Sequence, residues 1–190
     1  INAIRTFWYR NGDWRRPVPS ANLERQINWR LYKEYSKGLM TELACHQLQI
    51  GSWALNKLPE KVMGHGAITY WKDGREVYDN VSCLYVFDDG VKMTFDSVIT
   101  SWAPETANEN KGELILGERP KSDGTSLLLE AFVEAVITRK QPARIAEEGY
   151  YASMLCLLGH QALQEEKTLY FPDEYKINYL NHQSKTSEAV

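Results

Sequence analysis

The stretch VSCLYVFDDGVKMTFDSVITSW, residues 81–102, constrains the fold more than any other part of the sequence. Apolar and polar residues alternate on both sides of Asp89-Gly90. An Asp-Gly pair between two alternating runs is typical of a β-hairpin. Because one face of such a hairpin is apolar, another layer of structure must pack against it. The chain is therefore expected to contain an antiparallel or mixed sheet.

The remaining patterns complete this picture. Strands are predicted over residues 1–10, 61–71, 112–118 and 168–171, and helices over residues 36–59, 126–140 and 144–167. Ser36 is the expected cap of the first helix, and Pro59 follows its end. The order lacks the strict alternation of a doubly wound fold. We predict an α+β domain with an open, largely antiparallel or mixed β-sheet and helices packed on one face.

Composition narrows the functional class. The 190 residues suit one domain with a sizeable core, and the net charge of −3 with scattered basic residues argues against nucleic acid or an anionic membrane as partner. No apolar run reaches the length of a membrane span. The three cysteines are widely spaced, which disfavours a disulfide framework or a zinc site.

The chain opens with Ile1 inside a strand-like run and without a signal-peptide pattern. We therefore expect a piece of a longer protein, cut at a domain boundary and ending in a polar tail over residues 173–190. The expected location is the cytoplasm; a periplasmic location would require an export signal before Ile1.

A histidine interrupts the apolar pattern of the helix predicted at 36–59. His46 lies beside the stripe formed by Leu39, Leu43, Ile50 and Ala54, with Glu42 four residues before it and Gln49 three residues after it. An imidazole beside a carboxylate can transfer a proton near neutral pH. The alternative is a structural histidine. A metal site would need more ligands than this motif supplies.

The preceding loop combines tryptophan with arginine: Trp14, Arg15, Arg16, Trp29 and Arg30. Indole faces stack on sugars, and guanidinium groups bind hydroxyls and carboxylates. A carbohydrate-like or acidic substrate would suit these groups, although arginine–tryptophan stacking can also serve only to rigidify a loop. A second aromatic and basic stretch follows at residues 70–75, where Tyr70 and Trp71 could line the site or an interface, and Lys72–Arg75 is expected to be a solvated turn.

The segments RNGDWRRPVP…ERQINWRLYKEYSKGLMTELACHQLQIGSWAL and GAITYWKDGREVYDNV resemble the C-terminal domain of the Gfo/Idh/MocA family. The resemblance runs over residues 1–173 and is strongest to bacterial NADH-dependent dehydrogenases. It implies a glyceraldehyde-3-phosphate dehydrogenase-like C-terminal domain that binds substrate and forms homo-oligomers. The family's N-terminal Rossmann domain, which binds NAD or NADP, would be absent from this chain.

The family carries an Asp-x-x-x-His motif, often with a second aspartate three residues later. His46 matches the histidine, Glu42 takes the place of the first aspartate, and Gln49 stands where the second would be. The resemblance implies that His46 is a general acid/base oriented by Glu42, and that a lysine of the Rossmann half completes the group. Gln49 and the tryptophans and arginines of the loop would bind the substrate.

The implied function is the catalytic half of an NAD(P)-dependent oxidoreductase acting on a sugar, polyol or related hydroxy compound. The chain has no G-x-G-x-x-G motif, and the GHG at residues 64–66 is expected to serve packing. We therefore expect no cofactor binding, no metal and no activity from this chain alone. The resemblance also implies an oligomer interface on an exposed sheet face bearing Tyr85, Phe87, Met93 and Phe95, unless the domain's own helices cover that face.

Two alternatives remain at this point. Some relatives are NAD-dependent glycoside hydrolases, which often carry a Tyr-Pro-Thr-His-like segment that LACHQ, residues 43–47, does not match. The other alternative is a non-catalytic, sheet-based binding or assembly module in which His46 is structural.

Overall fold

A five-stranded mixed sheet forms the centre of the protein, whose computed structural model describes residues 1–100, 124–140 and 145–175. The strands lie in the order β1-β4-β3-β2-β5. Their bounds are β1 Ala3–Asn11, β2 Lys61–Ala67, β3 Asn80–Val86, β4 Lys92–Thr100 and β5 Leu169–Tyr170. Strand β1 runs parallel to β4, and the other neighbours are antiparallel. The predicted α+β class with an open mixed sheet is confirmed.

The β3–β4 hairpin has the predicted turn. The Phe87 amide donates to the Val91 carbonyl at 2.9 Å, and Gly90 has a φ of 79°, which a glycine adopts without strain. In the resulting register Tyr85 lies opposite Met93. The alternation read from the sequence therefore fixed which side chains share a face.

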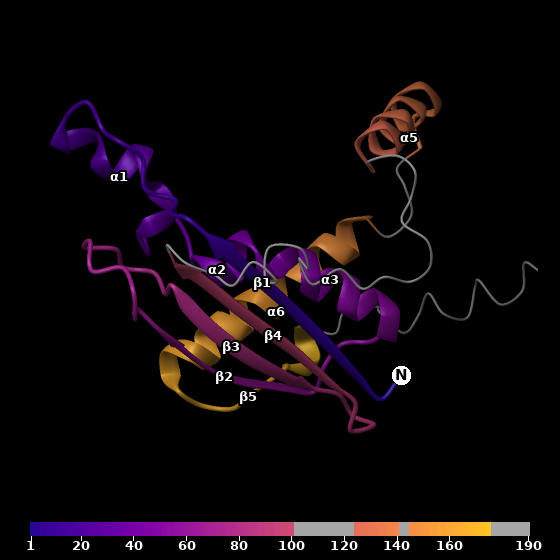
Figure 1. Cartoon of the computed structure of the whole chain (residues 1–190). Helices are drawn as coiled ribbons and strands as arrows, with labels where there is room; N and C mark the ends of the chain where they lie inside the picture. The colour runs from indigo at the N-terminus through magenta and orange to yellow at the C-terminus, as the bar shows by residue number, and fades with distance from the viewer. Residues whose placement is uncertain (101–123, 141–144, 176–190) are drawn as a thin grey trace, which may run out of the picture.

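Three helices cover one face of the sheet: α2 (Leu39–Glu42), α3 (Ala44–Leu55) and α6 (Ile145–Glu165) (Figure 1). Helix α3 packs against α6 and β1, and α6 also packs on β2. The covered face carries Tyr85, Phe87, Met93 and Phe95, each at most 1% exposed. The prediction that these four residues form an exposed oligomer interface is thus wrong, because the domain's own helices bury them. The opposite face carries the half-buried Phe7, Tyr9, Leu84 and Val98.

The single helix predicted over residues 36–59 is in fact two helices. Helix α2 begins after Gly38, whose φ of 61° and close approach to Val77 both require glycine, since an added Cβ would lie 2.8 Å from the Val77 Cβ. Ser36 is not a helix cap; its Oγ accepts the Gly38 amide at 2.9 Å. Leu43, with φ −122° and ψ −47°, separates the two helices.

The break at Leu43 changes which face of the second helix is buried. Leu39 and Leu43 are buried as predicted, but α3 then buries Ala44, Leu48 and Gly51, and Ile50 is 37% exposed. The apolar stripe predicted for one continuous helix is therefore wrong at Ile50, whereas Ala54 is partly buried against the core as predicted. The reason is that Leu43 departs from helical geometry, so the residues before and after it do not share one continuous helical periodicity.

The loop predicted before these helices is an ordered arm. Residues 13–38 contain three short helical segments, η1 (Ala21–Leu23), α1 (Glu24–Ile27) and η2 (Trp29–Leu31), and α1 projects away from the sheet (Figure 1). A second irregular stretch, residues 68–79, follows β2. The buried Asp79 carboxylate holds it by accepting the amides of Thr69, Tyr70 and Trp71 at 2.8–2.9 Å.

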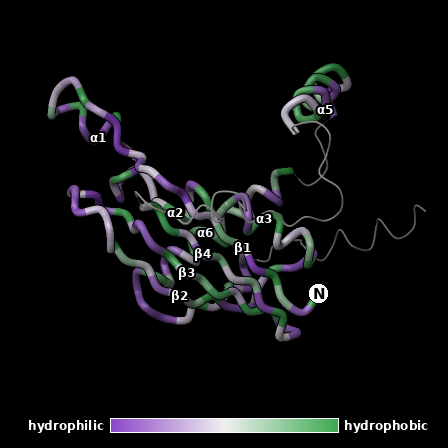
Figure 2. The backbone as a smooth tube through the Cα atoms, viewed as in Figure 1, coloured by the Kyte–Doolittle hydropathy of each residue, from purple (hydrophilic) through white to green (hydrophobic). Residues whose placement is uncertain are grey.

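Two helices follow the sheet, as predicted. Helix α6 is amphipathic and well packed, whereas α5 (Gly124–Thr138) exposes its apolar side chains, among them Leu128, Phe132 and Ile137. In Figure 2 hydrophobic residues, coloured green, occur along α5 as they do along the strands. The chain described ends with η3 (Asp173–Tyr175). The predicted strand at 112–118 and nearly all of the predicted tail lie outside the described residues.

Candidate functional site

His46 lies on the outward-facing side of α3, where its side chain is exposed. Its imidazole packs beside the Trp8 indole of β1, with ring centres 5.8 Å apart and planes at 40°. Trp8 follows the alternation of β1 and points to the helix-covered face, which brings it under the outer edge of α3. An exposed imidazole with one side against an indole is open to a ligand on its other side.

Gln49, Ile50 and Trp53 share this side of α3 with His46. The spacing of three, four and seven residues from His46 places them in one stripe, which we call the outer face of α3. Ile50 is 37% and Trp53 54% exposed, and Gln49 is half-buried. The candidate catalytic residue therefore stands in an exposed patch that combines apolar and polar groups.

Glu42 is occupied by partners other than His46. One carboxylate oxygen accepts the Ser36 hydroxyl at 3.0 Å, and the other accepts Arg30 Nε at 3.0 Å. Within the described part of the chain, no hydrogen bond joins Glu42 to His46. The structure thus brings Glu42 together with Arg30, a residue predicted independently from the loop. Ser36, which completes this contact, was read from the sequence only as a helix cap.

Arg30 is held in a defined orientation. Its guanidinium carbon lies 4.6 Å from the centre of the Trp29 ring, so the predicted arginine–tryptophan stacking is present in this pair. Trp29 remains 36% exposed. The arm therefore places Arg30 and Trp29 beside Glu42 at the end of α2.

Arg15 belongs to a separate group of charges, which we call the ion cluster: Asp13, Arg15, Glu24, Asp73 and Arg75. Arg15 pairs with Glu24 and with Asp73, and Arg75 bridges Asp73 at 2.7 Å and Asp13 at 2.8 Å. The hydrogen bonds from Arg75, and then from Arg15, hold the pKa of Asp73 well below its usual value. The cluster ties the arm to the stretch that follows β2.

Burial of Arg75 corrects one prediction. The Arg75 side chain is only 2% exposed and also stacks on Trp71, with 5.0 Å from its guanidinium carbon to the ring centre. The stretch Lys72–Arg75 is therefore not simply a solvated turn, because two carboxylates draw its arginine inward. Trp71 donates its ring N–H to the Ile99 carbonyl at 3.0 Å, which fixes it to β4.

The described contacts of the other two predicted arm residues, Trp14 and Arg16, do not involve His46. Trp14 packs partly buried against the edge of the core. The backbone of Arg16 pairs with the side chain of Asn28, while its own side chain is exposed. Among the predicted substrate-binding residues, Arg30 and Trp29 are those that the described contacts connect to Glu42.

Other reactive groups lie in the core. Burial raises the pKa of the Cys83 thiol to about 12 and also raises those of Cys45 and Cys156, so none is a ready thiolate near neutral pH. His160 of α6 is 3% exposed, and neither ring nitrogen has a partner among the described residues. In the described ranges we find no cluster of three metal-ligating side chains and no helix suited to crossing a bilayer.

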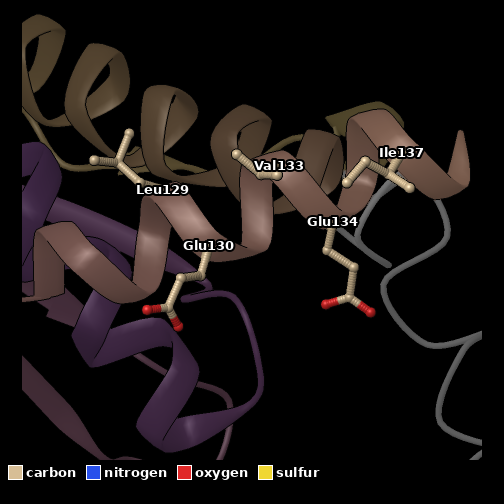
Figure 3. A pocket seen from close by; sticks show the side chains of 5 residues that line it. All are labelled: Leu129, Glu130, Val133, Glu134 and Ile137. Atoms are coloured by element: carbon tan, nitrogen blue, oxygen red, sulfur yellow. The ribbon is translucent and has the colours of Figure 1, made fainter.

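A hollow of about 440 Å³ lies along α5 and is lined by Leu129, Glu130, Val133, Glu134 and Ile137 (Figure 3). Leu129, Val133 and Ile137 follow one side of the helix in this view, and the two glutamates extend from another. All five residues come from a single exposed helix and none is a predicted site residue. This hollow is therefore not the site assembled around His46.

The glycines of the GHG stretch have a packing role. A Cβ on Gly64 would lie 2.3 Å from the Ser82 carbonyl oxygen, and one on Gly66 would lie 2.7 Å from the Tyr78 ring. Both glycines sit inside β2 rather than between a strand and a helix, which is where a dinucleotide loop would be. The described residues thus offer no dinucleotide-binding loop at this motif.

Comparison with solved structures reveals related folds. Aldose-aldose oxidoreductase from Caulobacter crescentus, complexed with glycerol, is 14% identical with a TM-score of 0.63 over 90% of this chain and 55% of its own. The WlbA dehydrogenase from Bordetella pertussis, in complex with NADH and UDP-GlcNAcA, is 16% identical with a TM-score of 0.59 over 90% and 53%. Myo-inositol 2-dehydrogenase from Lactobacillus plantarum is 14% identical with a TM-score of 0.64 over 90% and 57%.

These identities are low, so the similarity concerns the fold, and this chain spans little more than half the length of each of these proteins. Comparison with curated protein sequences finds no match. The family model described as the GFO/IDH/MocA C-terminal domain matches residues 1–118, more than half of the chain. This chain is therefore a C-terminal domain of the Gfo/Idh/MocA family.

Proposed function

We propose that this chain is the substrate-binding and catalytic half of an NAD(P)-dependent oxidoreductase that acts on a sugar, polyol or related hydroxy compound. The cofactor would be held by an N-terminal Rossmann domain outside this chain. The observation that carries the proposal is the exposed imidazole of His46 on the outer face of α3; the resemblance of the surrounding motif assigns this residue to the family's histidine. A core histidine such as His160 could not meet a substrate.

The chemistry divides between the two halves. A nicotinamide held by the N-terminal domain would supply the acceptor for the hydride that leaves the carbinol carbon. His46 takes the hydroxyl proton as the C–O bond becomes a carbonyl, and returns it in the reverse direction. Trp8 would fix the plane of the imidazole, and Gln49, one turn along the same face, would donate or accept a hydrogen bond with a second hydroxyl.

The test is His46→Ala in the full-length protein, assayed by nicotinamide absorbance with a panel of sugars and polyols. We expect a hundred- to ten-thousand-fold decrease in kcat, the usual contribution of a general base, with an unchanged melting temperature. Gln161→Ala is the control, because Gln161 is an exposed polar residue of another helix, α6, where it bonds Glu165 at 2.7 Å. Full activity with reduced stability would instead support a structural His46 in a non-catalytic module.

We also propose that the protein forms a homo-oligomer through the uncovered face of the sheet. Phe7 and Tyr9 stack there with ring centres 5.5 Å apart, and Leu84 and Val98 extend the apolar surface across β3 and β4. A second sheet packed on this face would complete the layer that such a surface needs. Val98→Arg should convert the full-length protein to monomers in light scattering; an unchanged mass would refute this interface.

A further inference from the structure

The guanidinium group of Arg30 is fixed on two sides and free on a third. Its Nε donates to Glu42 Oε2 at 3.0 Å, and its plane lies over the Trp29 ring, 4.6 Å from its centre. No other described residue accepts a hydrogen bond from its two terminal nitrogens, and the side chain is 45% exposed. Arg30 therefore presents the open edge of a guanidinium fork whose orientation is already set.

Glu42 is the residue that sets this orientation. Its second oxygen accepts the hydroxyl of Ser36, which is 4% exposed and in turn accepts the Gly38 amide at 2.9 Å. The Glu42 side chain is itself only 18% exposed. Ser36 thus anchors the Oε1 atom of Glu42, and the Oε2 atom accepts the hydrogen bond from Arg30. We therefore assign Glu42 as a positioning residue that acts through Arg30.

Glu42 also links Arg30 to the segment that carries His46. Glu42 precedes His46 by four residues, across the break at Leu43, where the Leu43 amide bonds the Leu39 carbonyl and the His46 amide bonds the Leu43 carbonyl. This short separation along the chain is the reason for proposing that one substrate meets both groups. The ion pair with Glu42 uses only the Nε of Arg30, so its two terminal nitrogens can donate hydrogen bonds to an incoming anion.

We propose that the substrate is an anionic sugar or hydroxy compound, and that its carboxylate or phosphate group is bound by the free edge of Arg30. A planar fork with two parallel N–H groups matches the oxygens of both anions and binds them more strongly than it binds neutral hydroxyls. Anchoring at this point directs the neighbouring carbinol toward His46. This inference rests on the proposed function, since it assigns the substrate class of the same site.

The test measures binding to the full-length protein by calorimetry, with glucose, glucuronate, gluconate and glucose 6-phosphate as probes. We expect at least one acidic probe to bind tenfold or more tightly than glucose; glucuronate and gluconate against glucose 6-phosphate distinguishes a carboxylate site from a phosphate site. Arg30→Gln should abolish this preference and leave glucose binding unchanged, and Arg30→Lys should retain part of it.

Arg25→Gln is the matched control. Arg25 is also an exposed arginine of the arm, pairs with Glu76 at 3.0 Å, and lies over an aromatic ring, that of Tyr32, at 4.3 Å. The Arg25→Gln substitution should leave the preference for an anionic probe over glucose intact. Glu42→Gln should weaken binding of the acidic probe three- to tenfold without affecting glucose, and Glu42→Asp should restore part of the loss.

The proposal is overturned if no acidic probe binds more tightly than glucose, or if Arg25→Gln lowers the preference as much as Arg30→Gln does. These outcomes are independent of catalysis by His46. His46→Ala should keep the preference for an anion even though turnover is lost. A protein in which His46→Ala is fully active but Arg30→Gln removes anion binding would retain this inference and reject the proposed role of His46.

Discussion

Two histidines of this domain occupy opposite environments within one layer of helices. His46 is exposed on the outer face of α3, beside Trp8. His160 of α6 is buried, and its ring lies beside that of Tyr78. Burial, and then the charges of Lys37 and Lys33, lower the pKa of His160 to about 4. The comparison shows that residue type alone does not make an acid/base catalyst, because only the exposed imidazole can exchange a proton with a ligand.

The two faces of α3 also differ in burial. The largest expected change in the free energy of unfolding comes from a substitution on its buried face. Leu48 is 0% exposed on the inner face, so Leu48→Ala should lower the free energy of unfolding by about 2–5 kcal/mol. Ile50→Ala, its matched control on the outer face, should cost less than about 1 kcal/mol. Hydrogen exchange of the α3 and α6 amides in the full-length protein measures both; equal losses would show that the outer face is packed too.

The second expected effect is acid destabilisation through His160. Its pKa in the folded protein lies below the ordinary value of a histidine, so the unfolded chain binds more protons between about pH 6.5 and pH 4. The contribution of His160 to the free energy of unfolding should therefore be fully present above about pH 6.5. It should fall by roughly 3 kcal/mol as the pH approaches 4.

His160→Leu should flatten this pH dependence, measured as the urea midpoint of the full-length protein at a series of pH values. His65→Gln is the control, since His65 is exposed and should leave the slope in place. The groups that face His160 from other elements are Tyr78, Lys33 and Lys37. A slope that persists in His160→Leu would mean that another group is responsible.

The smallest effect concerns the support of His46. Trp8→Leu removes an aromatic contact worth about 1 kcal/mol, so kcat/KM should fall about five- to tenfold without loss of the fold. Tyr150→Leu is the matched control, because Tyr150 also makes an aromatic contact, with the Tyr151 ring at 5.4 Å, but lies on α6. If both variants behave alike, Trp8 does not orient the imidazole.

Local patterns predicted much of this fold. The hairpin at Asp89-Gly90, helix α6, the strand character of β1 and the ordered arm all follow from turn chemistry, periodicity and composition. The parallel pairing of β1 with β4 could not be predicted, because it joins residues almost ninety positions apart and leaves no local signal. Similarly, the alternation in β3 and β4 identified two faces without indicating which one the helices would cover.

The candidate site was predicted in part. His46, Glu42 and Arg30 were each identified from residue type and spacing, and the contact between Glu42 and Arg30 links two of these predictions. Trp8 was missed because an aromatic residue in a strand is ordinary. The inward position of Arg75 was missed because its partners Asp13 and Asp73 come from two segments that meet only in the folded chain.

The sequence by itself therefore determined most of the elements and the class of fold, since these depend on neighbours within a few residues, and the histidine motif was identified from its resemblance to the family. Tertiary structure alone decided where α3 begins, which face of the sheet is covered and which carboxylates hold which arginines. The physical reason is that the close approach of Gly38 to Val77, the cover over Tyr85 and Phe95, and the ion cluster all join segments that are distant along the chain.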